Sequence, residues 1–129
     1  NSESSKIFDI RERSFRFGVE IVRFVRNFPR DTAGFAIGGQ ALRSGTSIGA
    51  NIEEAQNCGS RKEFIHTLII ALKEARETEY WLKIINKVKL ADQNLIKELL
   101  LEANELIKIL TAIIKKTKIN LFNSSLHSR

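Results

Sequence analysis

The sequence predicts an all-α fold, an antiparallel four-helix bundle in up-down-up-down order. Apolar residues make up 43% of the 129 residues, and they recur at helical spacing in four segments. One proline and seven glycines provide too few turn signals for an all-β sandwich or barrel. The connections between the segments are short, which favours antiparallel packing of successive helices. We expect one domain over residues 1–129, with an ordered core at about residues 7–118 and frayed ends.

The first helix is predicted over roughly residues 8–28. It ends where Phe28 precedes Pro29, because proline disfavours helical geometry in the residue before it. Its apolar residues are predicted to share one broad face: Phe15, Phe17, Gly18, Ile21, Val22, Phe24, Val25 and Phe28. Its arginine stripe lies on the opposite face: Arg13, Arg16, Arg23 and Arg26. This stripe is either a solvated exterior or a contact surface for an anionic partner.

The second helix is predicted from Asp31 or Thr32, either of which can cap it, to about Cys58-Gly59. Five of the seven glycines fall inside it, each at a cost of about 1 kcal/mol relative to alanine. We expect close approach of another backbone to offset that cost, and a break near one of the glycines is the alternative. The apolar stripe contains Phe35, Leu42, Ile48 and Ile52. The polar stripe, either solvated or a hydrogen-bonded seam, contains Gln40, Ser44, Ser47, Asn51 and Glu54.

The third helix is predicted to begin with a capping box formed by Ser60 and Glu63, and to continue to about Leu90. The fourth starts at Asp92 and should fray beyond Asn120. Its apolar stripe contains Leu95, Leu99, Ala103, Leu106, Leu110 and Ile113. Its last turn carries a lysine cluster that complements the helix dipole: Lys115, Lys116 and Lys118.

The sequence offers no catalytic constellation, so we expect no enzyme activity, no cofactor and no metal. Cys58 has no dedicated activating base, and the two histidines, His66 and His127, are far apart. The segment from Glu63 to His66 matches one half of a di-iron motif but has no second copy. No phosphate-binding loop occurs. The carboxylates of the third helix are expected to form ion pairs: Glu74, Glu77 and Glu79.

The cysteine content and the net charge indicate the cellular compartment and the class of partner. One cysteine cannot form an internal disulfide, and the first residues lack the pattern of a signal peptide. The longest nearly apolar run is too short to span a bilayer. We therefore expect a cytoplasmic protein without a membrane partner. The net charge of +6 favours a polyanionic partner.

Three segments carry a family resemblance. Residues 42–55 read LRSGTSIGANIEEA, residues 60–64 read SRKEF, and residues 73–82 read KEARETEYWL. This pattern resembles the bacterial four-helix-bundle proteins related to those encoded in intervening sequences of 23S ribosomal RNA genes. The likeness extends from about Phe15 to Leu110. One departure is Ala55, where many relatives have glycine.

The resemblance implies a homopentameric ring of left-handed up-down bundles. A more distant relative is the accessory protein of diversity-generating retroelements, which binds nucleic acid and a reverse transcriptase. What this implies here is a non-enzymatic, nucleic-acid-associated oligomer. The family's polar signature matches five residues, which we assign by hypothesis to a structural or intersubunit network: Arg43, Ser47, Asn51, Glu54 and Glu77.

Two functions from different classes follow. The first is binding of RNA or DNA with weak sequence selectivity, with phosphate contacts from the arginine stripe and the lysine cluster. The second is a protein-interaction scaffold or accessory subunit, in which the positive charge serves only solubility. Nothing in the sequence identifies a nucleic-acid target.

Overall fold

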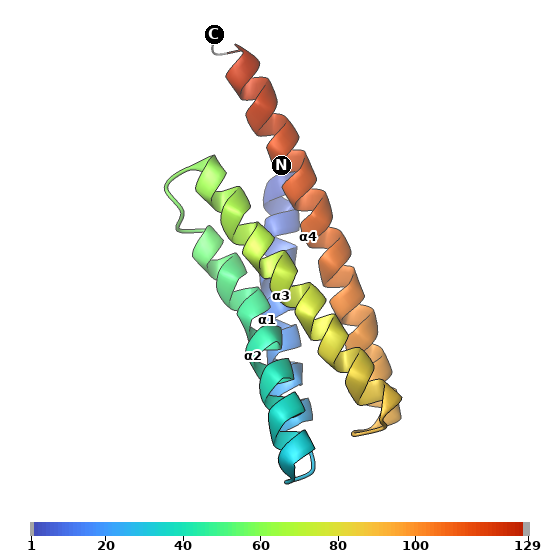
Figure 1. The fold of residues 1–129 in the computed structure, drawn as a ribbon. Helices are drawn as coiled ribbons and strands as arrows, with labels where there is room; N and C mark the ends of the chain where they lie inside the picture. Colours follow the sequence, from blue (N-terminus) through green and yellow to red (C-terminus); the bar gives the residue numbers. More distant parts are fainter. Residues whose placement is uncertain (1, 128–129) are drawn as a thin grey trace.

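The computed structural model describes residues 2–127 of the chain, with the side chains of residues 7 and 9–126. It contains four helices: α1 (Ser2–Val25), α2 (Thr32–Ala55), α3 (Arg61–Lys87) and α4 (Gln93–His127). No strand occurs within the described residues. Successive helices run in opposite directions, and α4 projects past the other three at its C-terminal end (Figure 1). The predicted all-α class with four helices is confirmed.

Local side-chain signals set the helix starts. Asp31 Oδ1 accepts a hydrogen bond from Gly34 N at 2.8 Å and caps α2. Ser60 Oγ accepts from Glu63 N at 3.1 Å and caps α3, as predicted. The Glu63 carboxylate accepts from the backbone N–H of Gly59 at 3.2 Å, one residue before the position of a standard capping box. Before α4, one carboxylate oxygen of Asp92 accepts from two backbone N–H groups at 2.9 Å.

Two helix ends lie beyond the predicted bounds, whereas α1, α2 and α3 each end about three residues before the predicted residue. α1 begins at Ser2 rather than near residue 8, and α4 continues to His127 rather than ending near Asn120. The added turns carry apolar residues that pack against the core, Ile7 on α1 and Leu121 on α4. α2 is unbroken through all five of its glycines.

The glycines of α2 permit close approach between α2 and its neighbouring segments. A Cβ atom at Gly45 would lie 3.0 Å from two side-chain carbons of Ile21 on α1. At Gly34 a Cβ atom would collide with the carbonyl oxygen of Pro29. The tertiary compensation expected for the helical glycines is therefore present at Gly34 and Gly45, where a larger residue would displace the α1–α2 connection or α1. It is absent at Gly39, where a Cβ atom would meet nothing within 4 Å.

The buried face of α1 differs from the predicted one. It follows the heptad-like line of Ile10, Ser14, Phe17, Ile21, Phe24 and Phe28. Phe15 is 70% exposed and Val22 39% exposed, so both predictions were wrong. The predicted face was too broad, and at about 100° per residue both side chains point away from this line. On α2, Phe35 is likewise 67% exposed, since small residues such as Gly34 and Ala41 occupy the core face.

Candidate functional site

Arg13 of the arginine stripe is engaged within the bundle. Its Nη2 lies 2.6 Å from Glu102 Oε1 and its Nε 3.0 Å from Glu102 Oε2, a two-hydrogen-bond pair between α1 and α4. About a third of each side chain is exposed. The hydrogen bond with Glu102 raises the pKa of the Arg13 guanidinium, although partial burial acts in the opposite direction. Arg13 thus connects two helices, and Glu102 occupies the Nε–Nη2 edge of its guanidinium.

The other three arginines of the stripe lie in solvent. Arg16 pairs with Glu12 at 3.4 Å and Arg23 with Glu20 at 2.9 Å, each within one turn of α1. Arg26 is exposed, and no ion pair engages it among the described residues. Exposed one-turn pairs contribute little free energy because water and salt screen them. These guanidinium groups can therefore exchange a carboxylate for a phosphate at small cost.

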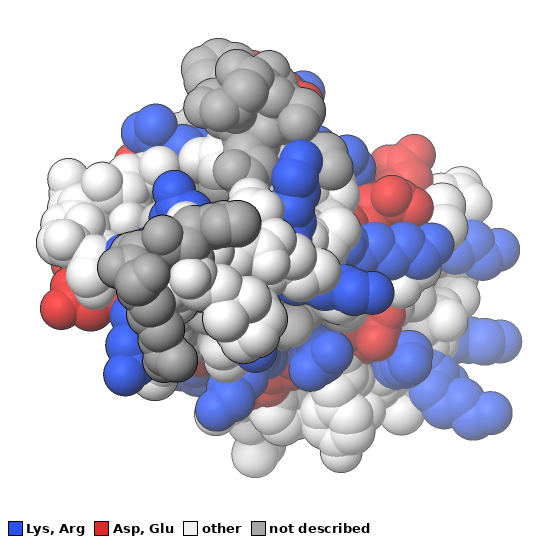
Figure 2. All heavy atoms as spheres, turned by 90° about the horizontal axis from the view of Figure 1, so that it is seen from above, with Lys and Arg blue, Asp and Glu red and all other residues white. Residues whose placement is uncertain are grey.

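The lysine cluster lies at the other end of the molecule from the C-terminal half of the arginine stripe. Lys115 and Lys118 are exposed on α4, and Lys116 is half-buried. No Asp or Glu follows Glu105 in the sequence, so this end of α4 is uniformly basic. Figure 2 looks onto the end of the bundle where α4 emerges, and Lys and Arg side chains project at several points of its edge. α1 and α4 are antiparallel (Figure 1). Arg26 directly follows the end of α1 and Lys118 is near the end of α4, so the two residues lie at opposite ends of the bundle.

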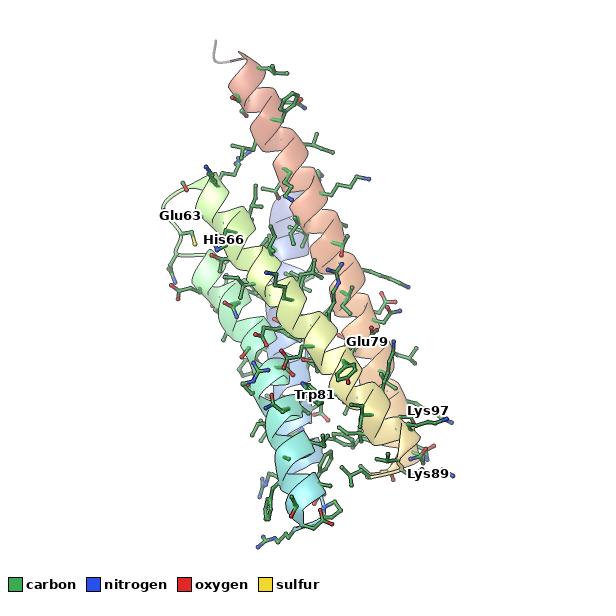
Figure 3. All side chains as sticks on the ribbon, in the orientation of Figure 1. Glu63, His66, Glu79, Trp81, Lys89 and Lys97 are labelled. Atoms are coloured by element: carbon green, nitrogen blue, oxygen red, sulfur yellow. The ribbon has the colours of Figure 1, made fainter. Side chains whose placement is uncertain are left out.

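The structure joins two of the five residues assigned to the polar network. Arg43 on α2 forms ion pairs with Glu74, at 3.2 Å, and with Glu77, both on α3. The indole Nε1–H of Trp81 donates to the same Glu77 carboxylate at 3.0 Å. Trp81 is labelled on α3 in Figure 3, and it follows Glu77 by four residues, about one helical turn. Glu74 and Trp81 were not predicted to belong to this network, although their spacing from Glu77 at three and four residues was an available signal.

The remaining network residues bond locally or not at all. Ser47 Oγ donates to the carbonyl oxygen of Arg43 at 2.6 Å, and Asn51 Nδ2 donates to that of Ser47 at 2.8 Å. Both bonds stay within α2 and span one turn. Glu54 is exposed, and among the described residues its carboxylate makes no hydrogen bond or ion pair. Fully buried Ser44 donates to the carbonyl oxygen of Gln40 at 2.9 Å. The polar stripe is therefore satisfied mainly by its own helix backbone.

The residues with catalytic or metal-binding potential are dispersed. Cys58 Sγ lies 3.4 Å from Thr67 Oγ1, and His66 is exposed on α3 (Figure 3). Glu63 is used in the cap of that helix. The side chain of His127 lies outside the described residues. Over the part of the chain that the structure describes, no three His, Cys, Asp or Glu side chains converge on a metal-sized site.

Comparison with known proteins identifies the family. Residues 6–112 match the family model of the 23S rRNA-intervening sequence protein. The chain belongs to this family. This family member also resembles the crystal structure of a protein of unknown function from the S23 ribosomal protein family of Bacteroides thetaiotaomicron. The two are 40% identical with a TM-score of 0.80, over 85% of this chain and 98% of that chain. No curated protein matches.

The resemblance inferred from residues 42–82 is thereby confirmed. The match includes the whole arginine stripe and the residues of the polar network, and it ends before the lysine cluster. Among the described residues, none of the four helices combines the length and apolar content that a membrane span requires.

Proposed function

We propose that this family member is a non-catalytic helical oligomer that binds RNA or DNA through the outer face of α1. One observation carries the proposal: Phe15, Arg16 and Arg23 are exposed on one side of α1, and exposed Arg26 follows directly after α1, with its backbone N–H still bonded to Val22 O. At 100° per residue these four positions fall within about 100° of the helix circumference. A helix face with cations and an exposed aromatic ring matches the chemistry of single-stranded nucleic acid.

The energetics of this face favour phosphate binding. The carboxylates that pair with Arg16 and Arg23 lie on the same helix in solvent, so their competition with a phosphate is weak. Phe15 presents most of its ring, and stacking on an aromatic ring contributes about 1–3 kcal/mol per base. No base-reading element accompanies these groups, so binding should depend strongly on salt and weakly on sequence.

The other basic residues have different parts in this proposal. The lysine cluster forms a second basic site near the C-terminal end of α4. A second segment of nucleic acid, or the nucleic acid bound by a neighbouring subunit, can reach it. We assign Arg13 to the connection with Glu102 rather than to phosphate binding. The five residues of the polar network also have two different roles in this proposal. Arg43 and Glu77 join α2 to α3. We propose that Ser47, Asn51 and Glu54 act at an intersubunit contact.

Assembly into a homopentamer in the cytoplasm is part of the proposal. The family resemblance implies the ring, and several large apolar side chains outside the nucleic-acid face remain exposed on the single subunit, including Phe35 and Leu101. A ring repeats a weak basic face several times, so the subunits can bind one polyanion with greater avidity. Light scattering of the purified protein, before and after nuclease treatment, measures the subunit number and any co-purifying nucleic acid.

Fluorescence anisotropy with a labelled 30-nucleotide RNA of mixed sequence tests the binding face. The triple variant Arg16→Gln, Arg23→Gln and Arg26→Gln should bind more weakly. Its salt slope should fall by about 2, at about 0.7 per lost phosphate contact on a single strand. The matched control neutralises three exposed lysines on α3 and α4: Lys73, Lys87 and Lys97. Equal losses in the two triple variants would show that only net charge matters, and they would contradict the proposed face.

A protein-interaction scaffold is the second candidate. The exposed apolar side chains favour it, because contiguous apolar surface commonly marks protein contacts. The large exposed ones are Phe15, Val22, Phe35, Tyr80, Val88, Leu101, Ile119, Phe122 and Leu126. Affinity isolation from the native cell in the presence of nuclease separates the candidates. A stoichiometric protein that stays bound favours the scaffold, and loss of all bound material favours nucleic-acid binding.

A further inference from the structure

A pocket of 660 Å³ opens at the end of the bundle where α2 connects to α3. Figure 3 shows this connection beside Glu63, and Figure 2 looks onto the same end of the molecule. Side chains of all four helices reach its wall. Its volume lies in the range of about 300–1,000 Å³ that is typical of small-molecule sites.

Four apolar side chains form the inner part of this pocket, and polar groups line the rest of it. Ile113 of α4 and Ala55 of α2 are almost fully buried beneath it, and Ile7 of α1 and Phe64 of α3 are half-buried at its sides. These four side chains come from four different helices, so they hold their positions through the packing of the whole bundle. Such a wall favours a hydrocarbon chain or an aromatic ring over a charged group.

The charged side chains that line the pocket are both arginines. They are Arg11 and Arg61, and no Asp or Glu is among the lining residues. Two carboxylates lie just outside the lining, where Glu53 binds Arg11 and Glu63 accepts from the backbone N–H of Gly59. Arg11 is held by Glu53 through two hydrogen bonds of 2.9 and 3.0 Å. Arg61 is exposed at the start of α3, and no ion pair engages it within the described residues. One guanidinium is therefore available to bind an anion beside an apolar wall.

We propose that this pocket binds a small amphipathic anion, with its acidic head at Arg61 and its apolar body against Ile7, Phe64 and Ile113. A carboxylate and a phosphate monoester share the required chemistry. The two arginines in the lining favour this anion over an amphipathic cation of the same size. This inference does not depend on nucleic-acid binding, since none of these residues belongs to the outer face of α1.

Cys58 provides a direct test of occupancy. It is the single cysteine of the chain, it lines the pocket, and it is half-buried. The rate at which N-ethylmaleimide modifies Cys58 in the full chain therefore reports on access to this site. Four ten-carbon probes are used below their micelle-forming concentrations: decanoate, decyl phosphate, decanol and decylamine. We expect one or both of the anions to slow modification and raise the melting temperature, and decylamine to do neither.

The two anionic probes distinguish the acidic head groups. Protection by decanoate alone assigns the site to carboxylates, and protection by decyl phosphate alone assigns it to phosphate monoesters. Decanol should protect more weakly than the better anion, because it fills the apolar wall without pairing with the guanidinium. If N-ethylmaleimide modifies Cys58 at the same rate without probe and in the presence of each probe, the proposal is overturned.

A matched pair of variants tests the role of Arg61. In Arg61→Gln the better anion should protect Cys58 about tenfold more weakly, the change expected from loss of one charge-assisted hydrogen bond. Lys62→Gln removes the same charge from the next residue, which is exposed and does not line the pocket, and should leave protection unchanged. Melting temperatures without probe confirm that both variants fold. Equal protection by decylamine and decanoate, or equal losses in the two variants, would overturn the proposal and leave RNA binding unaffected.

Discussion

Arg13 on α1 and Glu102 on α4 form a two-hydrogen-bond ion pair across 89 positions of the sequence. Both side chains are about two-thirds shielded from solvent. The pair lies in the cleft between α1 and α4, where pockets of 460 and 360 Å³ open on either side of Arg13. It therefore joins the first and last helices at a place where apolar packing is incomplete.

Replacing Arg13 with alanine should lower the free energy of unfolding by about 1–2 kcal/mol. The change removes two charge-assisted hydrogen bonds and leaves the Glu102 carboxylate partly buried without its partner. Urea denaturation measures the loss. Arg16→Ala, which breaks only an exposed one-turn pair, serves as the control and should change stability by less than about 0.5 kcal/mol. A double-mutant cycle with Glu102→Ala that gives no coupling energy would refute the role assigned to the pair.

Alanine at Gly34 should be strongly destabilising, by about 2–3 kcal/mol. Its Cβ atom would collide with the carbonyl oxygen of Pro29, and the connection between α1 and α2 would have to move. Gly39 lies five residues further along the same helix, at a position where an added Cβ atom would meet nothing within 4 Å. Gly39→Ala should instead stabilise the protein by about 0.5–1 kcal/mol, the difference in helix propensity. Thermal melts of the two variants should therefore shift in opposite directions.

The sequence predicted the helices better than their faces, for a physical reason. Caps and breaks such as Ser60 and Pro29 act over a few residues, so they can be identified in the sequence. The orientation of α1 depends on which residues of α2 allow close approach. Glycines such as Gly45 have no apolar side chain to mark the core face, and Phe15 was wrongly placed inside.

The candidate site was predictable only in part. The family resemblance identified Arg43 and Glu77, which the structure joins by an ion pair. The ion-pair partner of Arg13 depends on the axial offset between α1 and α4, and no local sequence pattern specifies that offset. The separation of Lys118 from Arg26 was implicit in the predicted antiparallel order, because the end of the fourth helix meets the start of the first.

Glu53 should make stability depend on pH. The hydrogen bonds from Arg11 lower the pKa of this carboxyl below its ordinary value, although desolvation opposes the shift. A carboxyl with a depressed pKa in the folded state stabilises the protein above its unfolded-state pKa. That contribution is lost as the pH falls through the folded-state value. Wild type should therefore melt above Glu53→Gln at neutral pH, and the difference should disappear in acid.

Carboxyl titration by NMR checks the cause of that pH dependence. The Glu53 resonance should titrate at a lower pH in wild type than in Arg11→Ala. Both side chains are largely in solvent, so added salt should bring the two midpoints together. Identical midpoints at low salt would show that the pair does not form in solution.

Glu77 should contribute more to stability than its exposed neighbours, because Arg43 and Trp81 both bind its carboxylate. Glu77→Gln should lower the free energy of unfolding by about 1 kcal/mol, since it weakens a charge-assisted contact while preserving the shape of the side chain. The intrinsic fluorescence of Trp81, the single tryptophan, should shift as its Nε1–H loses an ionised acceptor.

Glu54→Gln is the control for this prediction. It removes an exposed carboxylate that has no side-chain partner among the described residues, and should leave both stability and fluorescence unchanged. If the Glu54 variant instead lowers the subunit number seen by light scattering, Glu54 acts between subunits. If the Glu77 variant matches wild type in both stability and fluorescence, the contact from α2 to α3 through Arg43 does not stabilise the bundle.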